Sequence, residues 1–262
     1  MNIVVFIKQV PDTNDVKWTQ NNNIDRTKMD SIINPVDKQA IEAALRLKEA
    51  YSANITAITM GPSKAIEVLK EAIALGVDDA AILCDSKFSG SDTCATSRVL
   101  AAAVKERFPD TDLILFGQSA IDGETSQTGP STAVRLGYPF VCHVNEIVEM
   151  NNNKIIINTE TDTYKDVLEV QMPAVLCISN YVFKPRIPKI NGYIRSQDYS
   201  YKSYNIYELN IPETQTGVKG SPTYVSCVYK TADDRNCKMI YPKDNENFAN
   251  EIMMEIKEIM GH

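Results

Sequence analysis

The sequence is poor in the side chains that most often perform catalysis. It has two histidines, His143 and His262, and its six cysteines form no CxxC pair. One histidine follows a predicted strand and the other ends the chain, so neither resembles a general base. Cysteines within apolar runs are typical of reduced core thiols. We therefore expect no catalytic side chain, no disulfide and no metal site.

Excess positive charge and long apolar runs are missing as well. The 262 residues include 27 Lys and Arg against 34 Asp and Glu, and the basic residues are scattered, which argues against a nucleic-acid partner. The opening MNIVVFIKQVP is too short to cross a bilayer and lacks a charged lead-in. We expect no membrane insertion and a cytoplasmic protein. With 44% hydrophobic residues, the chain can bury a full core.

Strands and helices alternate through the first half of the chain. Apolar runs predict strands at 3–10, 54–60, 80–84 and 113–116, and helical spacing predicts helices beginning near Asn34, at 63–75, at 94–107 and near Thr125. This order indicates an α/β fold with a doubly wound, mostly parallel sheet, which binds ligands at its carboxyl edge. Polar caps at Asn34, at Asp92 or its neighbours Ser91 and Thr93, and at Thr125 place three helix starts at that edge.

The best candidate site is the stretch LILFGQSAIDGETSQTGPSTAVRLGYP at residues 113–139. Gly117 stops a buried strand, and the polar loop 118–127 that follows has no Lys, Arg, His or Cys, so we expect it to bind through its backbone. Thr125, Ser126 or Thr128 can cap the next helix. Free N–H groups at a helix start attract phosphate, although an ordinary strand-to-helix connection can carry the same residues.

The alternation ends after Pro139. Strands predicted at 141–150 and 154–159, and a further pair at 167–179, add an antiparallel part to the sheet. Residues 181–210 lack periodicity and are rich in tyrosine, which favours an interface or a loop packed on its own domain. An amphipathic helix is predicted at 247–260. We predict a nucleotide-binding domain at 1–229, which includes the segment 181–210, and a C-terminal helical arm at 230–262.

Several motifs, in this order, resemble the beta (small) subunits of electron-transfer flavoproteins along nearly the whole chain. They are IKQVPDT, INPVDKQAIEAALRLKE, MGPSKAIEVLKEAIALGVDDAAILCD, SGSDTCAT, FGQSAIDGETSQTGPSTAVRLGYP, MPAVLCIS followed by KPR, and GSPTYV. The resemblance implies a Rossmann-like sheet and a nucleotide in its crevice. It also implies a heterodimer with an alpha subunit that carries the electron-transferring FAD. The amphipathic C-terminal helix could dock on this chain's own core or on another subunit, and we predict that it docks on the alpha subunit.

The resemblance also assigns residues to the crevice. The nucleotide pocket would comprise Phe6, Asn34, Pro35, Val36, Asp37, Met60, Gly117, Gln118, Ser119, Ala120, Ile121, Asp122, Gly123, Glu124, Thr125, Ser126, Gln127 and Thr128. A second loop would lie near a nicotinamide nucleotide and comprises Ser89, Gly90, Ser91, Asp92 and Thr93. Because the carboxylates of Asp122 and Glu124 would repel phosphate, we expect them to cap loop N–H groups.

Within the family, the sequence resembles the members whose small subunit holds FAD and bifurcates electrons from NADH. The shared features are the KQVPDT opening, the INPVD helix start and the pair Asp122-Gly123. FAD is therefore the predicted cofactor, with AMP as the alternative, and NADH is the predicted electron donor. The small residues of the loop 89–91 are compatible with the space that FAD needs.

Partner recognition is expected at Arg186, Ile190 and Tyr193, with an acyl-CoA dehydrogenase-type flavoenzyme as partner. Members that serve such enzymes usually carry a Lys-rich run and a Leu anchor there, whereas this chain has IRSQDYSYKS and Ile190. Two other classes use a similar sheet. An ATP-pyrophosphatase-like enzyme would need a Ser/Gly-rich loop where this chain has KQVPDT, and a simple ATP-binding module would leave the segment 181–210 and the terminal helix unused.

Overall fold

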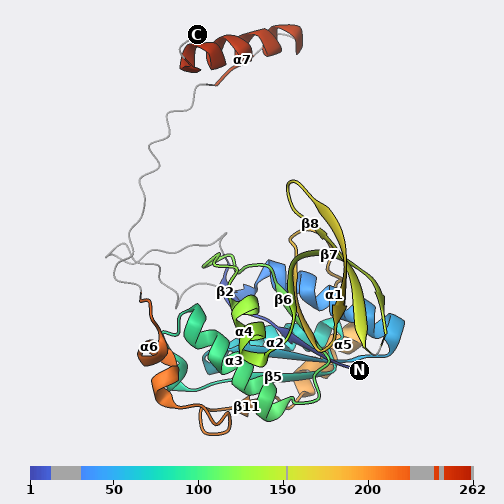
Figure 1. The fold of residues 1–262 in the computed structure, drawn as a ribbon, viewed down its shortest axis with the longest axis vertical. Coiled ribbons are helices and arrows are strands. Elements are labelled where there is room, and N and C mark those ends of the chain that lie inside the picture. The colour runs from blue at the N-terminus through green and yellow to red at the C-terminus, as the bar shows by residue number, and fades with distance from the viewer. Residues whose placement is uncertain (13–30, 152, 225–238, 242–244, 261–262) are drawn as a thin grey trace. The chain divides into compact units, whose positions relative to one another are not determined.

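The computed structural model describes residues 1–12, 31–151, 153–224, 239–241 and 245–260 (Figure 1). The chain divides into two units, Met1–Cys227 and Val228–His262. The smaller unit contains the helix α7 (Asn245–Met260), close to the amphipathic helix predicted at 247–260. After the first strand the sequence also predicts an excursion from Trp18 to Asn23, and these residues lie outside the described ones. No helix in the described part of the chain has the length and apolar composition that crossing a bilayer requires.

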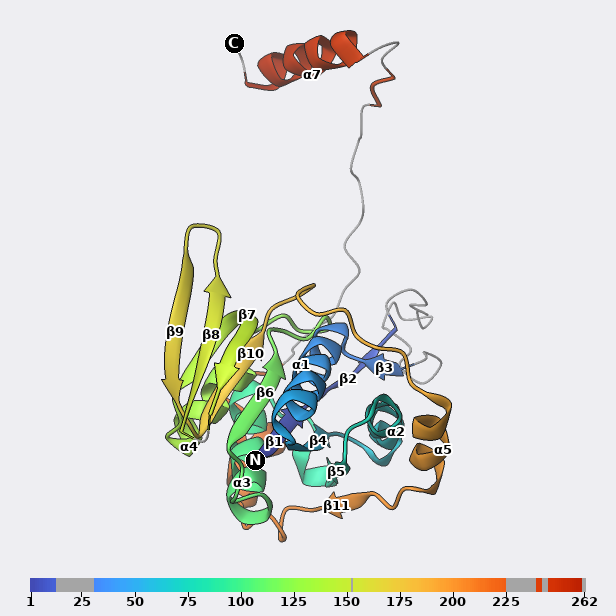
Figure 2. The same cartoon turned by 90° about the vertical axis from the view of Figure 1, so that its right-hand side faces the viewer.

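A nine-stranded sheet forms the centre of the larger unit (Figure 2), in the order β11-β5-β4-β1-β6-β10-β7-β8-β9. The strands from β11 to β7 are parallel to their neighbours, and β7, β8 and β9 pair antiparallel. The predicted mostly parallel sheet with an antiparallel part is therefore confirmed. The strands are β1 (Asn2–Phe6), β4 (Asn54–Met60), β5 (Asp79–Leu83), β6 (Leu113–Gly117), β7 (Phe140–Met150), β8 (Lys154–Glu160), β9 (Lys165–Gln171), β10 (Ala174–Ile178) and β11 (Lys202–Tyr204).

Helices cover both faces of this sheet (Figure 2). The helices α1 (Pro35–Tyr51) and α2 (Ile66–Leu75) lie on one face, and α3 (Thr93–Arg107) and α4 (Thr128–Leu136) lie on the other. Successive side chains of a strand point to opposite faces. In β1, Ile3 and Val5 join the buried cluster under α1 and α2, whereas Val4 and Phe6 join the cluster under α3 and α4. Apolar residues on both faces explain why the strands read as continuous apolar runs.

The strand predicted at 3–10 is two strands. β1 ends at Phe6, and β2 (Gln9–Pro11) leaves the main sheet to pair antiparallel with β3 (Ser31–Ile33). Between them, the backbone N–H of Lys8 donates to the carboxylate of Asp37 at 2.7 Å. This hydrogen bond takes the place of a sheet hydrogen bond, so an apolar run alone could not reveal the break.

The segment 181–210 contains regular structure, which corrects the expectation that it is irregular. The helix α5 (Ile190–Asp198) packs on α2, and β11 extends the sheet beyond β5. A Cβ atom at Gly192 would lie 2.2 Å from the carbonyl oxygen of Ala74, so only glycine allows this approach of α5 to α2. Tyr201 packs against the buried core, whereas Ile190 and Tyr193 are 80% and 60% exposed. One part of the segment therefore packs on the core of the unit, and another part is exposed to solvent.

Candidate functional site

Three helix starts meet near the carboxyl ends of the central parallel strands. The loop 118–127, which follows β6, is hydrogen-bonded to the residue before α1 and to the first residue of α3. The first link comes from Asn34, and the second is a 3.4 Å contact between the hydroxyls of Thr93 and Thr125. The structure therefore brings together the two predicted loops and the predicted helix start at Asn34. We call this arrangement the crevice.

Asn34 pins the loop to the start of α1. It occupies the N-cap position, as predicted, and it is fully buried, but its side chain makes no capping hydrogen bond. Instead, its Nδ2 donates to the carbonyl oxygen of Ser119 at 2.8 Å, and its Oδ1 accepts from the N–H of Ile121 at 3.3 Å. Two residues of the predicted nucleotide pocket are thus held by an amide from a distant part of the chain.

Asp37 joins β1, β6 and α1 beneath the crevice. Its buried carboxylate accepts from the N–H of Lys8, and a Cβ atom at Gly117 would lie 2.5 Å from its Oδ1. Only glycine at 117 leaves room for this contact. Desolvation raises the pKa of Asp37 to about 7, although hydrogen bonds from Lys8, Asn34 and Gly117 act in the opposite direction. Because the carboxylate of Asp37 accepts hydrogen bonds from these protein groups, its role is to hold the residues around the crevice in place.

The loop 118–127 turns back on itself before α4. The N–H groups of Gly123 and Glu124 both donate to the carbonyl oxygen of Ala120, and Glu124 and Ser126 adopt left-handed backbone angles with φ of 44° and 54°. Such angles are uncommon for residues other than glycine and are often found at functional sites. Gln118 points toward the neighbouring strands, where its Oε1 accepts from the N–H of His143 at 2.9 Å.

The start of α4 differs from the prediction. The N-cap is Gln127, not Thr125, Ser126 or Thr128, and it makes no side-chain capping hydrogen bond in the described structure. Pro130 has no N–H and the N–H of Ser131 donates to the carbonyl oxygen of Gln127, so the N–H groups of Thr128 and Gly129 are the ones that this first turn offers to a ligand. A Cβ atom at Gly129 would lie 2.6 Å from the Sγ of Cys177, so glycine lets this first turn lie against β10.

Lys8 is a crevice residue that sequence reasoning missed. Its Nζ lies 2.6 Å from the Oδ1 of Asp122, and its side chain is 50% exposed. The carboxylate of Asp122, expected to cap loop N–H groups, forms this ion pair instead. The loop has no basic residue of its own, so Lys8 supplies a cation to it from the end of β1. The available signal was a lysine near the carboxyl end of the first predicted strand, which leads to the ligand edge.

The other predicted residues lie at the ends of β1 and β4 and at the start of α3. Phe6 is buried, and its ring stacks on Phe116 with 4.9 Å between the ring centroids, while Met60 is half-buried at the end of β4. Asp92 caps α3, as its position predicted, because its Oδ1 accepts from the N–H of Ala95 at 2.9 Å. The crevice therefore combines an aromatic core, one helix start with a side-chain cap, that of α3, and two without one, those of α1 and α4.

Arg186 and the two predicted recognition residues on α5 have different environments. The guanidinium of Arg186 pairs with Glu42 at 2.9 Å and with Glu49 at 2.5 Å, which ties the segment 181–189 to α1. Ile190 and Tyr193 lie exposed on α5. Among the three, the two apolar residues are the ones free to contact a partner.

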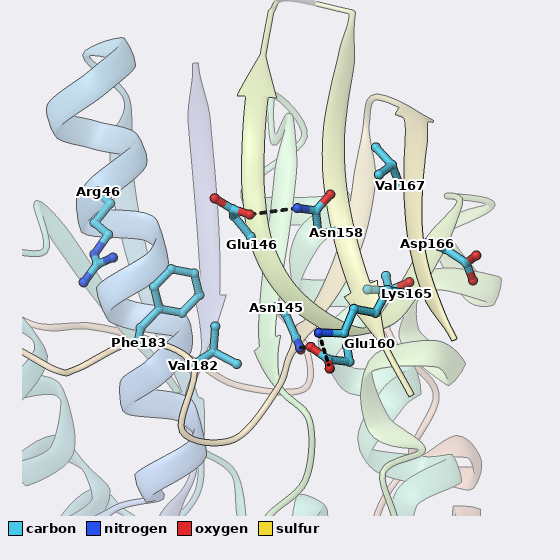
Figure 3. Close-up of a pocket in the computed structure, with 11 residues that line it drawn as sticks. Arg46, Asn145, Glu146, Asn158, Glu160, Lys165, Asp166, Val167, Val182 and Phe183 are labelled. Carbon is cyan, nitrogen blue, oxygen red and sulfur yellow. Dashed lines mark hydrogen bonds and ion pairs between the residues drawn. The ribbon is translucent and has the colours of Figure 1, made fainter. Parts of the chain in front are cut away.

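A groove of about 500 Å³ lies between α1 and the antiparallel strands (Figure 3). Its lining includes Arg46 and Phe183 and contains none of the predicted cofactor residues. Several polar side chains in it are paired with one another: Asn158 with Glu146 at 2.7 Å, and Glu160 with Asn145 at 3.1 Å and with Lys165 at 2.8 Å. This mutual pairing makes the groove a weaker candidate than the crevice.

Comparison with known proteins links the crevice to one family. Residues 22–198, which include α1, the loop 118–127 and the start of α3, match the electron transfer flavoprotein domain. The chain is 39% identical over 229 residues to the electron transfer flavoprotein subunit beta of Thermoanaerobacterium thermosaccharolyticum, covering 86% of each chain. It is 35% identical over 260 residues to the caffeyl-CoA reductase-Etf complex subunit CarD of Acetobacterium woodii, covering 98% of each chain. It is 37% identical over 236 residues to the acryloyl-CoA reductase electron transfer subunit gamma of Anaerotignum propionicum, covering 86% of each chain.

Proposed function

Because this chain belongs to the electron transfer flavoprotein family, as a relative of its beta subunits, we propose that its crevice holds FAD. In this proposal the chain forms a heterodimer with an alpha subunit and passes electrons from NADH towards an acyl-CoA dehydrogenase-type flavoenzyme, by bifurcation. The bound flavin supplies the redox chemistry, and the chain's own residues bind and orient it. The observation that carries the proposal is the uncapped start of α4 beside a loop that Asn34 holds in place.

The crevice suits a dinucleotide because its donors are mainly backbone groups. The N–H groups of the first turn of α4 and the positive end of its dipole favour a phosphate, and Lys8 adds a cation at the mouth. Burial raises the pKa of Asp37, so at neutral pH its carboxyl carries less negative charge beneath a phosphate than an ordinary aspartate would. We assign the loop Ser89–Thr93 to the nicotinamide nucleotide, since its small side chains leave space beside the start of α3.

Two relatives support the proposed class of partner, because their names include caffeyl-CoA reductase and acryloyl-CoA reductase. We assign partner recognition to the exposed side chains of Ile190 and Tyr193 on α5, since a few exposed apolar or aromatic residues often provide most of the binding energy of an interface. We assign alpha-subunit docking to the arm 230–262. Its helix α7 carries exposed Met253, Ile256 and Ile259, which would favour association.

The cofactor content of the complex tests the proposal. The chain is co-expressed with its alpha subunit, the ligands are released with acid, and chromatography identifies them. We expect two FAD per heterodimer and bleaching of the flavin absorbance when NADH is added. One FAD and one AMP, without bleaching by NADH, would contradict FAD binding and bifurcation in this chain. A complex without flavin or AMP would contradict the nucleotide site altogether.

A further inference from the structure

The crevice loop 89–92 is held by a short segment near the end of the larger unit. This segment, Gly217–Thr223, begins with the short helix α6 (Gly217–Gly220) and includes most of the motif GSPTYV. We call it the clasp. The Oγ of Ser91 accepts from the N–H of Gly217 at 3.0 Å, and the Oγ of Ser221 accepts from the N–H of Asp92 at 2.8 Å. The loop 89–92 and the clasp are more than 120 residues apart in sequence, so the contact arises only from the fold.

The carboxylate of Asp92 joins the clasp to α3. Its Oδ1 caps the helix by accepting from Ala95, and its Oδ2 accepts from the N–H and the Oγ1–H of Thr223 at 3.0 and 2.8 Å. Desolvation alone would raise the pKa of Asp92, but the hydrogen bonds from Ala95 and Thr223 hold it below its usual range, so the group is ionised. One carboxylate thus serves both the helix start beside the crevice and the C-terminal part of the unit.

Two glycines allow the clasp and the loop to lie against each other. Gly90 and Gly217 have φ of 74° and 56°, a region that favours glycine. A Cβ atom at Gly90 would lie 2.5 Å from the Cγ2 of Val218, and one at Gly217 would lie 2.3 Å from the carbonyl oxygen of Lys87. The contact therefore requires a glycine in the loop, Gly90, and a glycine in the clasp, Gly217.

We propose that Gly217, Ser221 and Thr223 are positioning residues that hold the loop 89–92 in the conformation that binds NADH. The proposal rests on the proposed function, in which NADH binds beside this loop. A loop that is already ordered loses less conformational entropy when a ligand binds, so the clasp raises affinity without touching the ligand.

Three variants of the heterodimer test the clasp, with a matched glycine as control. Thr223→Val removes the Oγ1–H donor and Thr223→Ser keeps it, while Gly217→Ala disturbs the close approach. Gly137→Ala is the control, because Gly137 also has a positive φ, of 75°, but ends α4 with no atom within 4 Å of an added Cβ. Amide hydrogen exchange of residues 89–96 and steady-state kinetics with NADH are measured for each.

We expect faster exchange of residues 89–96 and an increase of about tenfold in the KM for NADH in Thr223→Val and Gly217→Ala, with kcat and flavin content unchanged. Thr223→Ser and Gly137→Ala should keep the wild-type KM. Unchanged exchange would overturn the inference, and so would faster exchange with an unchanged KM. If NADH does not reduce the wild-type complex, the proposed electron donor is wrong. Amide exchange of residues 89–96 then decides on the clasp by itself, with the same comparison of variants.

Discussion

Asn34→Ala is expected to loosen the crevice loop without removing a helix cap from α1. The side chain of Asn34 makes two hydrogen bonds to the loop, at 2.8 and 3.3 Å, and none that caps the helix. A net hydrogen bond contributes about 0.5–1.5 kcal/mol, and the longer of the two contributes less. Its partners, Ser119 and Ile121, are half-buried, so water replaces part of the loss. We expect a loss of about 1–2 kcal/mol, which corresponds to about 5- to 30-fold weaker nucleotide binding.

Asn34→Ser separates the two roles that this residue can have. Serine is a strong N-cap residue, so it could supply a helix cap that Asn34 does not make, but its short side chain has no amide to hold the loop. Titration of the flavin-depleted heterodimer with FAD and AMP gives the affinity, and amide exchange at 119–121 reports the loop. Both variants should weaken binding to the same degree and expose the loop. Wild-type affinity in Asn34→Ser, or unchanged exchange at 119–121 in Asn34→Ala, would refute the reasoning.

Three further predictions concern charge and recognition. The folded pKa of Asp37, about 7, lies above the unfolded value of about 3.9, so between these pH values the folded chain holds a proton that the unfolded chain has released. The free energy of unfolding should therefore fall as pH rises through this window, by at most about 1.4 kcal/mol per pH unit. Denaturant titrations should show a flatter pH dependence of this free energy in Asp37→Asn. In binding titrations, Lys8→Gln should weaken nucleotide binding and Asp122→Asn should strengthen it, because Asp122 competes with a phosphate for Lys8. Lys70→Gln on α2, which removes another paired lysine, serves as control. Equal weakening in Lys8→Gln and Asp122→Asn would contradict this competition. Tyr193→Ala should weaken docking on the flavoenzyme partner by about 1–3 kcal/mol, and so slow electron transfer, with an unchanged Tm. A lower Tm with normal transfer would show instead that the side chain is structural.

Local signals explain how much of the fold was predictable. The strand predicted at 54–60 is β4 with the same bounds, and the helix after Asn34 begins at Pro35, because proline favours the first helical turn. Asp92 was one of three polar residues that could cap α3, and it is the cap. In each case the physical cause lies within a few residues of the feature, so a single sequence contains it.

The features that sequence reasoning missed depend on distant contacts. Lys8 interrupts the first strand because Asp37, on α1, accepts its N–H, and its side chain meets Asp122 from a loop 114 residues away. The side chain of Asn34 serves the loop rather than its own helix for a similar reason. The strand β11 has only three residues, and it is a strand because it pairs with β5. No local sequence pattern reveals this pairing.

The position of β11 also has a consequence for how the chain reaches its native state. During synthesis, β1, β4, β5 and β6 are complete once residue 117 has emerged, but the edge of β5 receives its partner only when residues 202–204 follow. An unpaired edge strand can pair with another chain, and long-range pairing is slow because loop closure costs entropy. Fragments that end before Lys202 would keep this edge open, so they should aggregate more readily than the whole larger unit during expression.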